Sequence, residues 1–204
     1  MIDNFEIIKP LLTFNNPNEF YFVQIIQRKK DFIENKDKYG VSRLGRNNNN
    51  RLIKAYYIYS IEQLEAYKQE IIKLCELFNA RCGINLGKRH QKDVTLKCLE
   101  MISIALRKDN FDGISKIYNS ACGKGETTDK FWIIDLDKED LPRYSEIANI
   151  LYNCEPINTT KILATIPSKT GIHLITSKFN RQKFNEWLPN IEIHTNNPTN
   201  LYIP

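Results

Sequence analysis

The chain has 204 residues, of which 42 % are apolar, and carries a formal net charge of +5. This composition suits a globular protein of one domain or two small packed modules, and the mild basic excess is compatible with a polyanionic partner. The sequence predicts a cytoplasmic protein without membrane or zinc association, because no apolar run approaches 18 residues, acids occupy the N-terminal stretch where a signal peptide carries basic residues, and the five cysteines form no C-x-x-C pair.

The first half of the chain predicts two strands, a helix, a short strand and a further helix. Strand-forming residues fill 20–28 and 52–60. Ser60 and Gln63 match a capping box, and apolar residues then recur at helical spacing to about Asn79. Residues 81–87 predict a short strand and 91–107 a helix. We therefore expect an N-terminal α/β module at residues 1–110.

Two polar stretches in this half predict loops. Residues 28–51 are basic and rich in turn-forming residues, which indicates a loop within the N-terminal module. Residues 111–130 predict a connector, and ACGKGETTDK within it is typical of a loop. A phosphate-binding loop is the alternative for G-K-G, but the full signature is missing and no apolar strand leads into it.

The second half, residues 131–204, predicts the order β-α-β-β-α-β, followed by a final segment NLYIP. Strands are expected at 131–137, 161–168, 171–177 and 190–195, and helices at 141–153 and 181–188. This order is that of the split βαβ, or ferredoxin-like (RRM-like), arrangement. In that arrangement the strand at 131–137 lies between those at 171–177 and 190–195. The predicted fold class is α+β, with this module packed on the N-terminal one.

The strand FWIIDLD, residues 131–137, ends in two carboxylates. Asp135 and Asp137 point to the same face of a strand, about 6–7 Å apart at the backbone. Their charges repel unless a cation lies between them, and oxygen ligands of this kind suit Mg²⁺ or Mn²⁺. The alternative is that Asp137 caps a helix that begins at Lys138.

The neighbouring segments add further polar groups. His173 lies in GIHLIT, and Glu192 and His194 lie in NIEIHT. If the register permits, three carboxylates and one or two imidazoles share one sheet face, an arrangement that metal ions would stabilise. The turn PSKTG contributes Ser168 and Lys169, whose side chains, with the free backbone amides, are donors that hold phosphate oxygens. An ordinary hairpin turn is the alternative for this segment.

Taken in order, FWIIDLD, PSKTGIHLI and NIEIHT resemble the archaeo-eukaryotic primase superfamily, specifically its primase-polymerase branch. That family has an apolar strand ending in D-x-D, then S-x-x-G-x-H or a close variant, then an apolar-acid-apolar strand. The closing LYIP is similar too. The resemblance covers residues 131–204, and the N-terminal half agrees only in layout. Two differences are Glu192, where Asp is common, and the lack of a helicase or zinc-bearing extension after the third block.

The resemblance implies a metal-dependent nucleotidyltransferase, a DNA primase or polymerase that uses NTP or dNTP. Asp135, Asp137 and Glu192 would hold two Mg²⁺ or Mn²⁺ ions. Ser168 and His173, with Lys169 as a helper, would bind the incoming triphosphate. The template, single-stranded or primed DNA, would contact the basic residues Arg28, Lys29, Lys30, Arg43, Arg46, Arg51, Lys88 and Arg89. The expected setting is a phage or plasmid replication complex in a bacterial host, with a helicase or other replication proteins as partners.

Two other functions use the same residues. The first is a nucleic-acid-binding replication accessory protein that has the fold but no catalytic activity. It predicts DNA binding that needs no Mg²⁺ and survives Asp135→Asn. The second is a metal-dependent nuclease or phosphodiesterase, which would shorten labelled oligonucleotides without added nucleotides.

Overall fold

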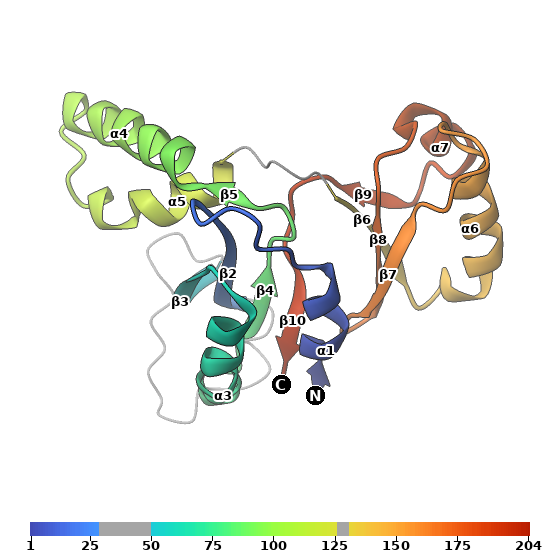
Figure 1. The fold of residues 1–204 in the computed structure, drawn as a ribbon, viewed down its shortest axis with the longest axis horizontal. Coiled ribbons are helices and arrows are strands. Elements are labelled where there is room, and N and C mark those ends of the chain that lie inside the picture. Colours follow the sequence, from blue (N-terminus) through green and yellow to red (C-terminus); the bar gives the residue numbers. More distant parts are fainter. Residues whose placement is uncertain (29–49, 126–130) are drawn as a thin grey trace.

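The computed structural model describes residues 1–28, 50–125 and 131–204, which form two antiparallel sheets and six α-helices (Figure 1). The predicted α+β class is therefore confirmed. No helix within these ranges is both long and apolar enough to cross a membrane.

The first sheet is built from both ends of the chain. Its strand order is β1-β10-β4-β2-β3, with β5 paired to β2. The strands are β1 (Ile2–Asp3), β2 (Glu19–Arg28), β3 (Asn50–Ile58), β4 (Arg81–Ile84), β5 (Arg89–His90) and β10 (Thr199–Ile203). Residues 199–203, which the sequence-based division assigns to the second module, thus pair with β1 and β4 instead. The physical reason is burial, because Leu201 and Tyr202 are enclosed in the core of the first half.

The helices of the first half include two that we expected and two that we did not. The helices α3 (Ile61–Phe78) and α4 (Gln91–Arg107) match the predicted segments. A short α1 (Phe5–Ile8) was not predicted, and α5 (Ile117–Lys124) occupies the expected connector. The segment 117–124 is ordered because Ala121 and Cys122 are buried against the aromatic residues Phe20 and Phe22 of β2. Single 3-10 turns form at 9–11, 114–116 and 141–143.

The helix α3 begins at the capping residue that the sequence predicts. The Ser60 hydroxyl accepts a hydrogen bond from the Gln63 backbone N–H at 3.1 Å, and the Gln63 side chain accepts one from the Tyr59 N–H at 2.7 Å. At its other end, Asn79 has a left-handed backbone with φ of 45°. Both ends of the helix therefore have satisfied backbone groups.

The cap gives a stability prediction. We expect Ser60→Ala to lower the free energy of unfolding by about 1 kcal/mol, because the N–H of Gln63 loses its acceptor. The measurement is denaturant unfolding followed by circular dichroism. Ser103→Ala, in the middle of α4, is the matched control, and it should cause no loss because alanine favours helix interiors. Equal effects of the two changes would contradict the assigned cap.

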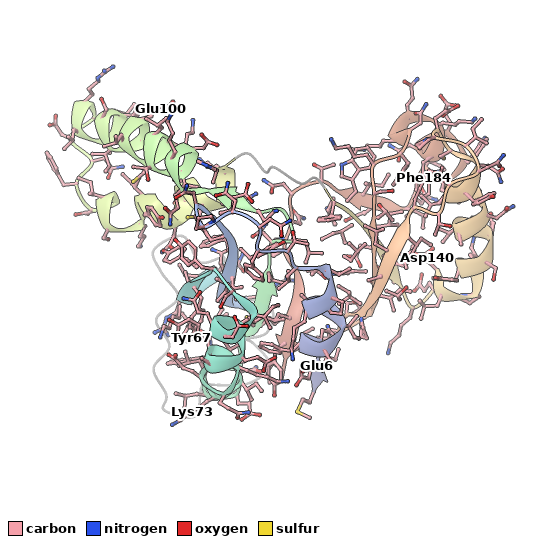
Figure 2. All side chains as sticks on the ribbon, in the orientation of Figure 1. Glu6, Tyr67, Lys73, Glu100, Asp140 and Phe184 are labelled. Carbon is pink, nitrogen blue, oxygen red and sulfur yellow. The ribbon has the colours of Figure 1, made fainter. Side chains whose placement is uncertain are left out.

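The second sheet contains β6 (Trp132–Asp137), β7 (Ile162–Pro167), β8 (Gly171–Thr176) and β9 (Glu192–His194). Its order is β7-β8-β6-β9, and all three pairings are antiparallel. The expectation that β6 lies between β8 and β9 is confirmed. The helices α6 (Tyr144–Asn153) and α7 (Arg181–Trp187) lie beside this sheet (Figure 1). They bury a cluster that includes Ile134, Leu136, Leu174 and Phe184, the last of which is labelled in Figure 2.

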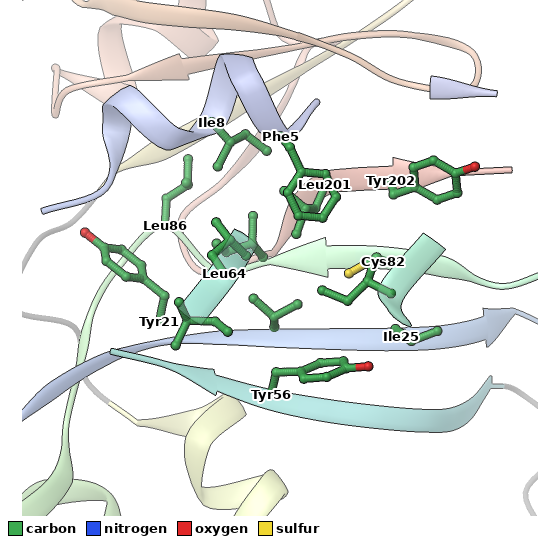
Figure 3. Packing of buried hydrophobic residues seen from close by; sticks show 14 of the residues in the cluster. Phe5, Ile8, Tyr21, Ile25, Tyr56, Leu64, Cys82, Leu86, Leu201 and Tyr202 are labelled. Atoms are coloured by element: carbon green, nitrogen blue, oxygen red, sulfur yellow. The ribbon is translucent and has the colours of Figure 1, made fainter. Parts of the chain in front are cut away.

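The opposite face of the second sheet packs into the main core of the first half. Ile133, Ile166 and Ile175 join the cluster that contains Phe5 and Ile8, part of which Figure 3 shows. The side chain of Asn4 connects the two sheets, because its amide donates to the carbonyls of Pro167 at 3.0 Å and Asn200 at 2.9 Å. The face of β6 that carries Ile133 is therefore turned toward the first sheet.

Candidate functional site

The register of the second sheet gathers the polar residues of three strands on one face. Asp135 pairs directly with His173 of β8 on one side and with Glu192 of β9 on the other. Residues that pair in this way project to the same face, with Cβ atoms about 4.5–5.5 Å apart. Alternation along each strand adds Asp137 and His194 to that face. The structure thus satisfies the condition on register that the sequence left open.

The side chains on this face form two acid–imidazole pairs. The Nε2 of His173 lies 3.6 Å from Oδ1 of Asp135, and the Nε2 of His194 lies 3.4 Å from Oε2 of Glu192. Asp135 is 36 % exposed, whereas Glu192 is 75 % exposed at the sheet edge. Asp135 therefore occupies the more enclosed position, and Glu192 lies where solvent has access.

The two ring nitrogens of His173 have different surroundings. Its Nδ1 lies 3.0 Å from the hydroxyl of the buried Thr199 on β10. Burial lowers the pKa of His173, and the nearby Asp135 only partly offsets this effect. The ring is consequently neutral at neutral pH, with one N–H to donate. A neutral imidazole in this position can donate to a ligand oxygen without adding a charge.

The turn between β7 and β8 is attached to the end of β6. The backbone N–H of Ser168 donates to the Gly171 carbonyl at 2.9 Å, and the N–H of Lys138 donates to the Thr170 carbonyl at 2.9 Å. Gly171 allows the close approach, because a Cβ there would lie 1.8 Å from the carbonyl oxygen of Leu136. These contacts hold the backbone of the turn, including Ser168, beside the strand that carries Asp135.

A pocket of about 400 Å³ has walls from both sheets. On the side of the second sheet it is lined by Asp135, Ser168, Lys169, Thr170, His173 and His194. Arg28 of β2, Arg81 of β4 and Asn200 of β10 line it from the first sheet, and Asn197 and Pro198 precede β10. Within the described lining, three side chains are cationic and Asp135 is the one carboxylate. The excess of positive charge favours an anionic ligand. The carboxylate of Asp135 can attract a cation that accompanies this ligand.

The contribution of the first sheet was missed by sequence reasoning. Arg81 begins the short strand RCGI and Asn200 lies within TNLYI, and these polar residues beside apolar ones were the available signal. Arg28 was expected to contact a template but lies in the same pocket as His173. Local sequence cannot show which face of one sheet approaches another. The pocket could therefore not be predicted from the sequence, because its second wall depends on the pairing of β10 with β4.

The three predicted metal-binding carboxylates share a face but do not converge. Asp137 and Glu192 are exposed and are not part of the pocket lining, and no group of three or more metal-binding side chains is gathered within the described ranges. Their backbone positions nevertheless bring three oxygen donors to adjacent strands, with imidazoles beside them. This set of donors fits Mg²⁺ or Mn²⁺ better than a metal that prefers sulfur.

The predicted template-binding residues have different surroundings. Arg51 stacks its guanidinium over the Phe78 ring, with 5.6 Å to the centroid. Lys88 is buried beside Glu19, with its ammonium 3.2 Å from the carboxylate. Arg89 is 0 % exposed and donates to the Cys122 carbonyl at 2.7 Å. The expected basic surface cluster at 88–89 is therefore not formed, because both charges have internal partners. Lys29, Lys30, Arg43 and Arg46 lie outside the described residues.

No protein-family model, curated protein or solved structure matches this chain at a significant level. The functional interpretation therefore depends on the geometry of the pocket and on the three sequence blocks that surround it.

Proposed function

We propose that the protein is a metal-dependent nucleotidyltransferase of the primase-polymerase type, which adds NTP or dNTP to a primer on a nucleic-acid template. The observation that carries this proposal is the pairing of Asp135 with both His173 and Glu192, at the border of a pocket with three cationic side chains. The strand order β7-β8-β6-β9 supports it, since this is the order of a ferredoxin-like module.

The carboxylates are assigned to the metal ions. Asp135, Asp137 and Glu192 would hold two divalent ions, as the sequence blocks imply. When bound, such ions activate the attacking hydroxyl and neutralise the leaving pyrophosphate. Asp135 is central in this assignment, because it lies on the middle strand and is the carboxylate at the pocket. Glu192 and Asp137 lie at the solvent side, where a primer end has access.

The phosphates are assigned to the hydrogen-bond donors and cationic side chains of the pocket. The Ser168 hydroxyl, the neutral His173 ring and the Lys169 ammonium are donors of the kind that bind phosphate oxygens. Arg28 and Arg81 add two guanidinium groups from the first sheet, which can bind phosphate in a bidentate manner. A triphosphate held in this way would extend from the β7–β8 turn toward Asp135. Helicase or other replication proteins would complete the complex.

The direct test is extension of a labelled primer on a DNA template by the purified chain. We expect products longer than the primer when NTP or dNTP is supplied with Mn²⁺ or Mg²⁺, and none after chelation with EDTA. Without template or nucleotides, the labelled strand should remain unchanged. Shortening of the strand without nucleotides would instead identify a nuclease. Metal-independent DNA binding with no extension under any condition would identify an accessory protein.

A further inference from the structure

The helix α4 is apolar on two opposite faces, and only the inner one is buried. Val94 on the inner face is 1 % exposed and packs against the cluster on β2. On the outer face, Leu96, Leu99 and Leu106 are 55 %, 59 % and 48 % exposed. The helix lies at one end of the molecule, beside α5 (Figure 1). Because a contiguous exposed apolar patch marks an interaction surface, the outer face of α4 is a candidate for one.

The outer face has the spacing of a surface that packs on another helix. Four of its residues occupy the a and d positions of a heptad repeat: Leu96, Leu99, Ser103 and Leu106. Along one border of this face, the e positions carry Asp93, Glu100 and Arg107. The apolar residues can therefore be covered by a second helix, whose partners at the border are set by these charges.

The outer face is complementary to itself when two copies of α4 run in opposite directions. With a twofold axis at the level of Met101, Leu96 lies opposite Leu106 of the second copy, and Leu99 lies opposite Ser103. Each contact is made twice, and all three leucines are covered. The small Ser103 side chain leaves room for Leu99, so the two helices can approach closely.

The charges at the border favour this same arrangement. Asp93 lies close to Arg107 of the second copy, and the twofold axis repeats this attractive contact. Glu100 lies near its own counterpart, but Lys97 donates to its carboxylate at 2.7 Å and offsets the charge. A shift of the pairing by one heptad toward the N-terminus would bring Asp93 beside Glu100, two acids. The opposite shift would leave two of the leucines beyond the end of the partner helix.

We infer that α4 pairs in an antiparallel manner with α4 of a second copy and makes the protein a homodimer. This inference does not depend on the proposed function, because α4 contributes no residue to the pocket lining within the described ranges. A single pair of helices gives an interface at the small end of the range for specific complexes. We therefore expect a dimer that exchanges with the monomer as the protein concentration changes.

The first test is sedimentation velocity of the full chain at increasing protein concentration, which should show conversion of monomer to dimer. Leu99→Glu should weaken the dimer by about thirtyfold or more, because it places a charge in the middle of the apolar contact. Tyr152→Glu is the matched control, since Tyr152 is 44 % exposed on α6, and it should leave the dimer unchanged. Thermal unfolding confirms that each variant is folded, and Leu99→Ser replaces Leu99→Glu if the latter is not.

The second test exchanges the charges at the border. Asp93→Arg or Arg107→Asp alone should weaken the dimer by about fivefold or more, because two attractive contacts become repulsive. The double variant restores opposite charges and should dimerise within about twofold of the wild type. This recovery is expected only if residues 93 and 107 of different copies lie side by side.

Each outcome supports or overturns the inference. A wild-type chain that stays monomeric up to about 100 μM overturns it and leaves the outer face of α4 to a different protein. A dimer that neither Leu99→Glu nor Leu99→Ser weakens forms through another surface, which also overturns it. A folded double variant that dimerises no better than the single ones contradicts the antiparallel pairing.

Discussion

Asp135→Asn should reduce nucleotide addition by about a hundredfold or more while the protein remains folded. Asparagine has nearly the same shape but no charge, so it cannot attract a divalent ion as a carboxylate does. Asp135 is the carboxylate within the described pocket lining, and its strand lies between the strands of His173 and Glu192. The measurement is the initial rate of primer extension at saturating Mn²⁺, with thermal unfolding to confirm the fold.

The control for this change is Asp109→Asn. Asp109 is exposed, lies after α4 and has a left-handed backbone with φ of 50°, a conformation that asparagine adopts readily. The same chemical change should therefore leave extension at the wild-type rate. If the Asp135→Asn protein extends primers within twofold of the wild-type rate, the proposed role of the Asp135 carboxylate is wrong.

The strands of the second sheet were predictable because the pattern that defines them is local. Apolar residues alternate with Asp135, His173 and Glu192 on three short strands, and the order of strands and helices restricts how these can pair. The helices α3 and α4 were predictable for the same reason, since apolar spacing and the Ser60 cap lie within each segment. The shared face of the acids and imidazoles could be expected from the sequence, subject only to the register.

The remaining features depend on contacts between distant segments. Lys88 and Arg89 form a basic cluster in the sequence, but their partners Glu19 and Cys122 are far away along the chain and allow both to be buried. The helix α5 is similar, because its residues Ala121 and Cys122 pack on β2, which is distant along the chain. The local sequence around a residue does not predict such distant partners.

The pocket also depends on contacts between segments that are distant along the chain. Its second wall comes from β2, β4 and β10, which are brought together by a strand from the end of the chain. Arg81 and Asn200 lie on that wall, and their polar character among apolar neighbours had no evident purpose in the linear sequence. The sequence thus indicated the acids and the turn, whereas the structure was needed to find the groups that face them.

Gly171→Ala should destabilise the protein by about 3 kcal/mol or more and should also lower primer extension. A methyl group at this position would lie 1.8 Å from the Leu136 carbonyl oxygen and 2.9 Å from the Cα of Asp137. Both atoms belong to the backbone of β6, so no side-chain rotation can relieve the contact. Because Gly171 pairs with Asp137, the strands β6 and β8 would have to separate where the carboxylates lie. Denaturant unfolding and the extension rate measure the two effects.

Gly123→Ala is the matched control for this substitution. Gly123 lies within α5, and a Cβ there would meet no atom within 4 Å. Alanine also favours a helix over glycine, so this change should leave stability unchanged or raise it by up to about 1 kcal/mol. The sequence predicted that Gly171 lies in a turn whose backbone amides could donate to phosphate oxygens.

If Gly171→Ala instead unfolds at the wild-type denaturant midpoint, the close approach of β8 to β6 is wrong, and the pairing of Asp135 with His173 that depends on it is wrong as well.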